Sequence, residues 1–246
     1  MVFSERMRRA SLEKRSRIVL GLDLKPGLPE NLLSKALKIL DEVYDEVCGI
    51  KVNLHLIIPL GFNELKEIVD KAHAHGLQAI ADLKLNDISA TNVVATKILW
   101  DIGFDAVICN PFVGFEEGLG PCIKEAHSMD RGIITLTYMS HKGAVEGYGL
   151  DVLKGGRLVK MYDLFIERAV EWNVDGLIVG ATNPSIIKYV RERVKDIPIF
   201  SPGVFVQGGD PKDAVRAGSD YLIVARAIIE SNNVKAAARE IKNMTY

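Results

Sequence analysis

Residues 77–110 read LQAIADLKLNDISATNVVATKILWDIGFDAVICN, and this stretch carries the pattern that decides the fold. It opens with a short apolar run, continues with a segment of helical period over 88–103, and closes with a second apolar run at 105–110. Runs that are continuously apolar, without alternation, are typical of parallel strands buried on both faces. A helix between two such strands predicts a βαβ unit with a parallel sheet.

The same unit recurs along the whole chain. Eight apolar runs follow one another, at 17–23, 47–52, 77–84, 105–110, 132–138, 175–180, 197–204 and 220–225. Segments of helical period lie between them, among others at 29–43, 64–76, 88–103 and 208–218. Eight βα units in 246 residues predict an α/β fold, a single (β/α)8 TIM barrel whose one domain spans 1–246. An open, doubly wound sheet is the alternative.

Two further segments fall outside the repeated unit. Residues 3–16 are amphipathic and highly charged, and we expect them to form an extra N-terminal helix that closes the barrel bottom. Residues 139–157 are too long for a simple turn, which favours a functional loop.

Composition excludes several classes of protein. The chain is 48% hydrophobic with 31 basic and 32 acidic side chains, which is typical of a folded domain and argues against partners such as nucleic acid or anionic membrane. No run of about 18 apolar residues predicts a membrane helix, and the N-terminus lacks the apolar core of a signal peptide. The three cysteines are odd in number and irregularly spaced. They fit reduced thiols, so we expect a cytoplasmic protein.

Polar and charged side chains follow the predicted strands, at the barrel end where TIM-barrel active sites lie. Asp82 and Lys84 are two residues apart on one strand, so both should face the barrel interior while Leu83 faces the helices. Lys51, from the preceding strand, can reach the same place. Burying charges inside a barrel costs free energy unless the charges are paired. These residues are therefore expected to form either a structural ion pair or a catalytic network with shifted pKa values.

The links after the seventh and eighth strands predict a phosphate site. Residues 202–210 (PGVFVQGGD) contain three glycines, which let backbone N–H groups approach an anion. Arg226 follows the eighth strand and can bind phosphate oxygens in a planar fork. No metal site is expected, because no cysteine and histidine cluster has zinc spacing and His73 and His75 point to different helix faces.

At these residues the chain resembles a known family. Asp82-Leu83-Lys84-Leu85-Asn86-Asp87-Ile88, with Thr91 after it, is similar to the Asp-x-Lys-x-x-Asp-Ile-x-x-Thr signature of archaeal-type orotidine 5′-phosphate decarboxylases. Further matches occur in the family's order: Asp23, Lys51, Met139-Ser140-His141, Pro202-Gly203-Val204 with Gln207, and Arg226. The resemblance implies cofactor-free conversion of orotidine 5′-monophosphate to uridine 5′-monophosphate, the last step of de novo pyrimidine nucleotide synthesis.

The resemblance also implies a role for each matched residue. Lys84 would donate the proton to the pyrimidine carbon, Asp82 would face the substrate carboxylate, and Lys51 and Asp87 would complete an alternating charge network. The family is dimeric, so Asp87 and Thr91 would reach the partner's site. The remaining substrate contacts would come from Asp23 and Lys51 at the ribose, Ser140 at the pyrimidine, Gln207 and Arg226 at the phosphate, and Pro202, Gly203, Gly208 and Ala225 around them. Ala225 departs from the glycine usual in the family.

Three alternatives remain open. A magnesium-dependent sugar-phosphate decarboxylase or aldolase of the same barrel group would share the motif, although it would have a carboxylate where this chain has Lys51. A Schiff-base aldolase would need a deprotonated lysine, whereas Asp82 and Asp87 flank Lys84. A non-catalytic phosphate-binding barrel would not be expected to keep a costly charge network.

Overall fold

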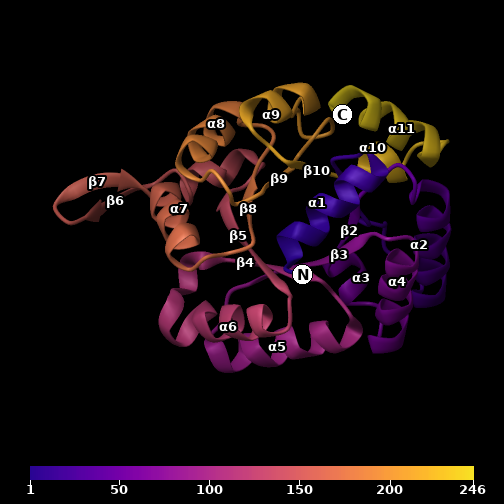
Figure 1. Cartoon of the computed structure of the whole chain (residues 1–246), viewed down its shortest axis with the longest axis horizontal. Helices are drawn as coiled ribbons and strands as arrows, with labels where there is room; N and C mark the ends of the chain where they lie inside the picture. The colour runs from indigo at the N-terminus through magenta and orange to yellow at the C-terminus, as the bar shows by residue number, and fades with distance from the viewer.

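The computed structural model describes residues 1–246 and has a closed barrel of eight parallel strands at its centre (Figure 1). The barrel order is β1-β2-β3-β4-β5-β8-β9-β10, and β1 pairs with both β2 and β10, so the sheet has no edge. Closure confirms the predicted barrel and excludes the open sheet. The barrel strands are β1 (Ile18–Gly21), β2 (Gly49–Asn53), β3 (Gln78–Leu85), β4 (Ala106–Cys109), β5 (Gly132–Tyr138), β8 (Gly176–Val179), β9 (Ile199–Pro202) and β10 (Tyr221–Val224).

Helices surround the barrel and begin and end at residues that suit those positions. Asp210 caps α9 by accepting a hydrogen bond from the Asp213 N–H, and Pro211 occupies the first helical position. Gly103 and Gly218 end their helices in the left-handed conformation. The helices are α1 (Phe3–Lys14), α2 (Pro29–Val43), α3 (Leu54–Ile57), α4 (Phe62–Ala74), α5 (Ser89–Ile102), α6 (Gly120–Ser128), α7 (Met161–Glu171), α8 (Pro184–Arg193), α9 (Pro211–Ala217), α10 (Arg226–Ile229) and α11 (Val234–Thr245), with short helical turns η1 (Pro111–Val113), η2 (Phe115–Leu119) and η3 (Lys142–Glu146).

Helix α1 lies across the end of the barrel and confirms the expected closure (Figure 1). Its buried residues Phe3, Met7 and Ala10 belong to the same apolar cluster as the side chains inside the barrel. A Cβ at Gly132 would lie 2.5 Å from the Phe3 ring, so only glycine leaves room for this ring. A second, larger apolar cluster fills the layer between strands and helices.

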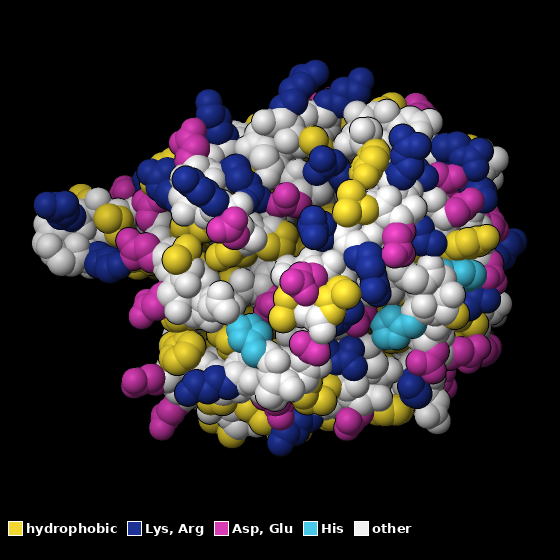
Figure 2. All heavy atoms as spheres, viewed as in Figure 1, with side chains coloured by type: hydrophobic (Ala, Val, Ile, Leu, Met, Phe, Trp, Pro, Cys, Tyr) yellow, Lys and Arg dark blue, Asp and Glu magenta, His cyan; other side chains and the backbone are white.

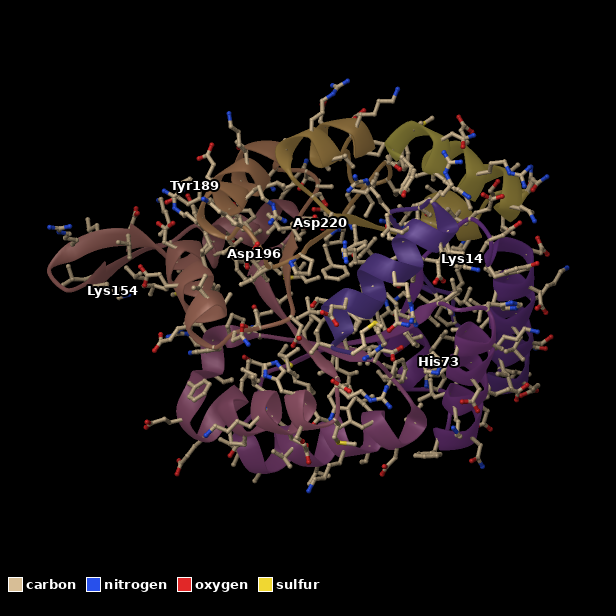
Figure 3. All side chains as sticks on the ribbon, in the orientation of Figure 1. Lys14, His73, Lys154, Tyr189, Asp196 and Asp220 are labelled. Carbon is tan, nitrogen blue, oxygen red and sulfur yellow. The ribbon has the colours of Figure 1, made fainter.

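The segment 139–157 differs from the expected loop. After η3 the chain forms a two-stranded antiparallel hairpin, β6 (Asp151–Lys154) and β7 (Arg157–Lys160), which extends beyond this segment and projects from the barrel in Figure 1. Gly155 and Gly156 form the turn, both with positive φ, as a two-residue hairpin turn requires. Lys154, which lies next to this turn on the hairpin (Figure 3), forms an ion pair with Glu167 of α7.

On the face seen in Figure 2, basic and acidic side chains are interspersed, in keeping with the near-neutral net charge. None of the helices combines the length and the hydropathy that crossing a bilayer demands.

Candidate active site

A cavity of about 230 Å³ opens at the carboxyl ends of the barrel strands. Eighteen residues line it, from seven of the strands and from the segments that follow β1, β5, β9 and β10. They include most of the residues predicted from the sequence: Asp23, Lys51, Asp82, Lys84, Ser140, Pro202, Gly203, Gln207, Ala225 and Arg226. The structure thus brings together side chains that lie up to about two hundred positions apart in the chain.

Two lysines and two aspartates form one chain of ion pairs in this cavity. Lys84 Nζ lies 2.7 Å from Asp82 Oδ1, and Lys51 Nζ lies 3.0 Å from Asp82 Oδ2. The same Lys51 ammonium lies 2.9 Å from Asp23 Oδ1. Signs therefore alternate along the row Lys84, Asp82, Lys51, Asp23. The central pair is buried, with 7% and 8% of the Lys51 and Asp82 side chains exposed, whereas Lys84 is 39% exposed toward the opening.

The alternating charges stabilise the ionised forms of Asp82 and Lys51, the two buried residues at the centre of the row. Burial alone would raise the pKa of Asp82, but the Lys51 and Lys84 ammonium groups outweigh it and hold that pKa below its usual value. Burial would likewise lower the pKa of Lys51, but the carboxylates of Asp82 and Asp23 raise it above its usual value. The centre of the site therefore holds charged side chains that are shielded from solvent. Interactions between charges are stronger in such a setting than in water.

Local backbone geometry aims Lys84 at Asp82. The pairing of β3 with β4 shifts register between Ala81 and Leu85, and Lys84 lies within this irregularity with a left-handed φ of 50°. Leu83 packs into the outer apolar layer, as expected. A positive φ is uncommon for a residue with a side chain, and such conformations cluster at functional sites.

Three predicted site residues do not line the cavity of this chain. Asp87 is exposed, and its Oδ1 accepts a hydrogen bond from the neighbouring Ile88 N–H. Thr91 is also exposed, in the first turn of α5, and Gly208 lies in the exposed turn before α9. Within one chain the second carboxylate of the charge row is therefore Asp23, and not Asp87.

The loops after β5 and β9 meet over the cavity. Ser140 Oγ donates a hydrogen bond to Gln207 Oε1 at 2.6 Å. Gly203 has a φ of +92°, and a Cβ there would lie 2.6 Å from the Ser140 Cβ, so glycine is required by both conformation and space. These contacts join the two loops directly above the charged row.

Ala225 and Arg226 form the junction between β10 and α10. The Arg226 side chain is exposed, lines the cavity and makes no ion pair within the chain. The methyl group of Ala225 packs against Gly21, where a Cβ would lie only 2.9 Å away. Gly21 therefore makes room for the Ala225 side chain.

Sequence reasoning missed Asn53. This residue lines the cavity, and its Nδ2 donates to Asp23 Oδ1 at 2.7 Å. The available signal was its spacing, since a residue two positions after Lys51 on the same strand faces the same side.

Several residues outside the cavity have structural roles. Trp100 and Trp172 are buried packing residues. His73 and His75 diverge at the end of α4, where His73 contacts Asp105 and His75 contacts Asp41. Nowhere in the chain do three or more His, Cys, Asp or Glu side chains form a group that could hold a metal ion, and the carboxylates in the cavity are paired with lysines.

Comparison with known proteins agrees with this geometry. Residues 16–241 match the model of the orotidine 5′-phosphate decarboxylase / HUMPS family. Orotidine 5′-phosphate decarboxylase from Pyrococcus abyssi is 39% identical over 225 residues, 91% of this chain and 96% of its own length. The Methanococcoides burtonii protein of that name is 33% identical over 231 residues, 94% and 97% of the two chains.

Solved structures show the same relationship. Orotidine 5′-monophosphate decarboxylase from Methanocaldococcus jannaschii, in complex with the inhibitor BMP, superposes with a TM-score of 0.80 at 31% identity, over 93% of this chain and 98% of that one. The enzyme from Sulfolobus solfataricus superposes with a TM-score of 0.76 at 27% identity, over 93% and 97%. The match of the family model to most of the chain, supported by these relatives, shows that the chain belongs to the orotidine 5′-phosphate decarboxylase / HUMPS family.

Proposed function

We propose that this protein decarboxylates orotidine 5′-monophosphate to uridine 5′-monophosphate without a cofactor. The observation that carries the proposal is the row of alternating charges Lys84, Asp82, Lys51 and Asp23 in one cavity with Arg226. Relatives that are 32–39% identical over most of the chain bear the name of this activity.

In this mechanism the bond between the pyrimidine ring and its carboxylate breaks, and the electron pair stays on the ring carbon. The Lys84 ammonium stabilises the developing negative charge and then gives that carbon a proton. Asp82 holds the Lys84 ammonium in place through the 2.7 Å contact. Lys51 in turn neutralises Asp82, so that the whole row is arranged before the substrate binds.

The phosphate and the base are bound by the loops above the row. The planar guanidinium group of Arg226 binds the phosphate oxygens. The residues around the phosphate are Gln207, Pro202, Gly203, Gly208 and Ala225. Ser140 reaches the pyrimidine, and its hydrogen bond to Gln207 links base and phosphate recognition. Binding energy from the phosphate can then stabilise the closed site around the reacting carbon.

The magnesium-dependent alternative would need a different arrangement of charged groups in the same cavity. An enediolate mechanism needs carboxylates free to bind a cation, whereas Asp23 and Asp82 both contact the Lys51 ammonium. A cation there would be repelled by Lys51. This observation favours the nucleotide over a sugar phosphate.

One absorbance experiment tests the proposal. EDTA-treated protein is mixed with orotidine 5′-monophosphate, and the loss of its ultraviolet absorbance is followed. Rapid loss is the expected result. No loss, with activity on a keto-sugar phosphate once magnesium is added, would contradict the proposal and support the alternative.

We further propose a homodimer in which Asp87 and Thr91 complete the partner's site. Both residues are exposed in their own chain, next to exposed apolar side chains such as Ile88, which is 64% exposed, and Val94. Exposed apolar side chains beside an active site are typical of a protein interface.

Complementation distinguishes the dimer from a self-contained chain. Lys84→Ala and Asp87→Ala are each expected to be inactive alone. Co-expressed, they should form mixed dimers with one intact site, giving about a quarter of wild-type activity in a statistical mixture. Inactivity of the mixture would mean that the two residues serve the same chain's site.

The proposed domain organisation and location have their own support. We propose that residues 1–246 unfold as one domain, because α11 near the C-terminus packs against β1 and α2 near the N-terminus. A single calorimetric transition is expected. All three cysteines are unpaired and buried, which supports a reducing, cytoplasmic setting.

A further inference from the structure

Asp23 is held by two donors that share one of its oxygens. Lys51 Nζ lies 2.9 Å and Asn53 Nδ2 lies 2.7 Å from Asp23 Oδ1. Oδ2 accepts no hydrogen bond from the protein, and the side chain is 27% exposed, at the wall of the cavity. One carboxylate oxygen is thus saturated, while the other remains available to a donor inside the cavity.

The orientation of the Asn53 amide is fixed independently of Asp23. Its Oδ1 caps helix α3 by accepting a hydrogen bond from the His55 N–H at 3.0 Å. The His55 ring approaches the Leu24 carbonyl with Nδ1 at 3.0 Å, so this nitrogen is the donor. These contacts tie the loop after β1 to the start of α3, and they leave the Asn53 NH2 group only one direction, toward Asp23.

We propose that Asn53 is a positioning residue that locks the Asp23 carboxylate so that its Oδ2 accepts a hydrogen bond from a ribose hydroxyl, which makes the site selective for ribose over deoxyribose. The inference rests on the proposed nucleotide substrate and adds a specificity-determining residue to it. Without the Asn53 donor, Asp23 is held by the flexible Lys51 side chain alone, and its free oxygen loses a defined direction. Selectivity for a hydroxyl needs such a fixed partner, because a mobile carboxylate can turn to water when the hydroxyl is missing.

Variants can separate this role from helix capping. Asn53→Ser keeps a good N-cap residue, but its side chain is one bond too short to reach Asp23. Asn53→Asp keeps the cap acceptor and replaces the donor with a repelling carboxylate. Asn233→Ser is the matched control, because Asn233 caps α11 through the same kind of hydrogen bond, to the Ala236 N–H, and does not line the cavity.

The experiment measures binding of uridine 5′-monophosphate and of its 2′-deoxy and 3′-deoxy analogues by calorimetry, together with turnover of orotidine 5′-monophosphate. The wild type should prefer the ribonucleotide to at least one analogue by about tenfold or more. Asn53→Ser and Asn53→Asp should remove most of this preference and raise KM more than they lower kcat. Asn233→Ser should match the wild type, and the melting temperatures of all variants should stay within a few degrees.

Other results would overturn the inference. If Asn53→Ser keeps the wild-type preference, or if the wild type binds all three nucleotides equally, Asn53 only caps α3. A wild type that neither binds uridine 5′-monophosphate nor turns over the substrate would instead contradict the proposed function itself. The two failures are therefore distinguishable.

Discussion

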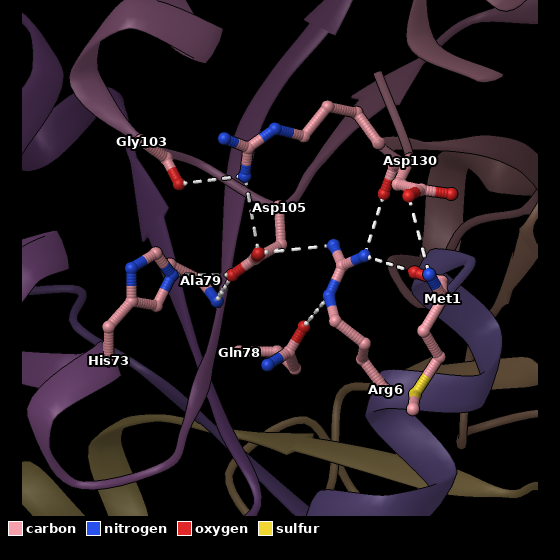
Figure 4. A network of polar contacts seen from close by, with 9 residues as sticks. Met1, Arg6, His73, Gln78, Ala79, Gly103, Asp105 and Asp130 are labelled. Atoms are coloured by element: carbon pink, nitrogen blue, oxygen red, sulfur yellow. Dashed lines mark hydrogen bonds and ion pairs between the residues drawn. The ribbon is translucent and has the colours of Figure 1, made fainter. Parts of the chain in front are cut away.

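Each end of the barrel holds a buried aspartate among cations, and the two differ in how completely the aspartate is surrounded. Asp105, at the closed end, accepts four hydrogen bonds: from Arg6, Arg131, the His73 ring and the Ala79 N–H (Figure 4). Asp82, at the open end, has only two partners, both lysine ammonium groups.

The cations at the two ends differ in the same way. At the closed end, Arg6 also donates to Gln78 and to the Met1 and Asp130 carbonyls, so each of its three side-chain nitrogens makes a hydrogen bond (Figure 4). At the open end, Lys84 has a single partner and keeps hydrogen-bonding capacity toward the cavity. A saturated network stabilises the fold, whereas an unsaturated one is available to a substrate.

The largest expected effect is on chemistry at the open end. Lys84→Ala should lower kcat by at least about 10⁴-fold, because it removes both the proton donor and the charge that stabilises the ring carbanion. Uridine 5′-monophosphate should still bind, and the melting temperature should change little, since Asp82 keeps Lys51. Stopped assays with concentrated enzyme check the rate, and retention of a tenth of the activity would contradict the assigned role.

At the closed end the same kind of change should affect stability and not rate. Asp105→Asn leaves Arg6 and Arg131 without their carboxylate, and breaking a buried ion pair costs about 3–5 kcal/mol. Urea unfolding should show this loss while kcat at low temperature stays near wild type. The contrast between the ends fails if Asp105→Asn lowers kcat as strongly as it lowers stability.

Arg226→Ala should produce an intermediate effect confined to binding. Loss of the phosphate partner should raise KM by about 30-fold, equivalent to about 2 kcal/mol. On orotidine, which lacks the phosphate, the variant and the wild type should behave almost alike. Comparing kcat/KM for the two substrates checks this, and an equal loss on both would remove Arg226 from the phosphate site.

The smallest expected effect is the pH dependence of stability. His73 and the other donors around Asp105 hold its pKa below the usual value despite burial, which would raise it. A lowered carboxyl pKa contributes stability above the unfolded value of about 4, and this contribution is lost as pH falls further. The stability gap between wild type and Asp105→Asn should therefore narrow from pH 6 to pH 3. A gap that stays constant or widens as pH falls would contradict a lowered pKa of Asp105.

The sequence predicted the fold well because continuous apolar runs and helix caps are local signals. Helix α2, for instance, spans the predicted residues 29–43. The hairpin β6–β7 was missed, since its strands are exposed and carry charges and lack the apolar run that marks a barrel strand. Its Gly155-Gly156 turn was the available signal.

The site was predictable to the extent that it depends on spacing along one strand. Asp82 and Lys84 are such a pair. Asp23 joins the charge row through contacts to β2, 28 and 30 residues later in the chain, which spacing does not reveal. Asn53 was missed because an uncharged amide has no distinctive pattern until its partner is known.

The projecting hairpin also affects where the chain can be altered. Leu153 and Leu158, opposite each other in β6 and β7, are 74% and 72% exposed, so the tip lies outside both apolar clusters. Exposed tips with small residues tolerate insertions and new chain termini. Opening the chain between Gly155 and Gly156, or inserting a fluorescent domain there, leaves all eight barrel strands continuous. This turn is therefore the natural attachment point for a reporter.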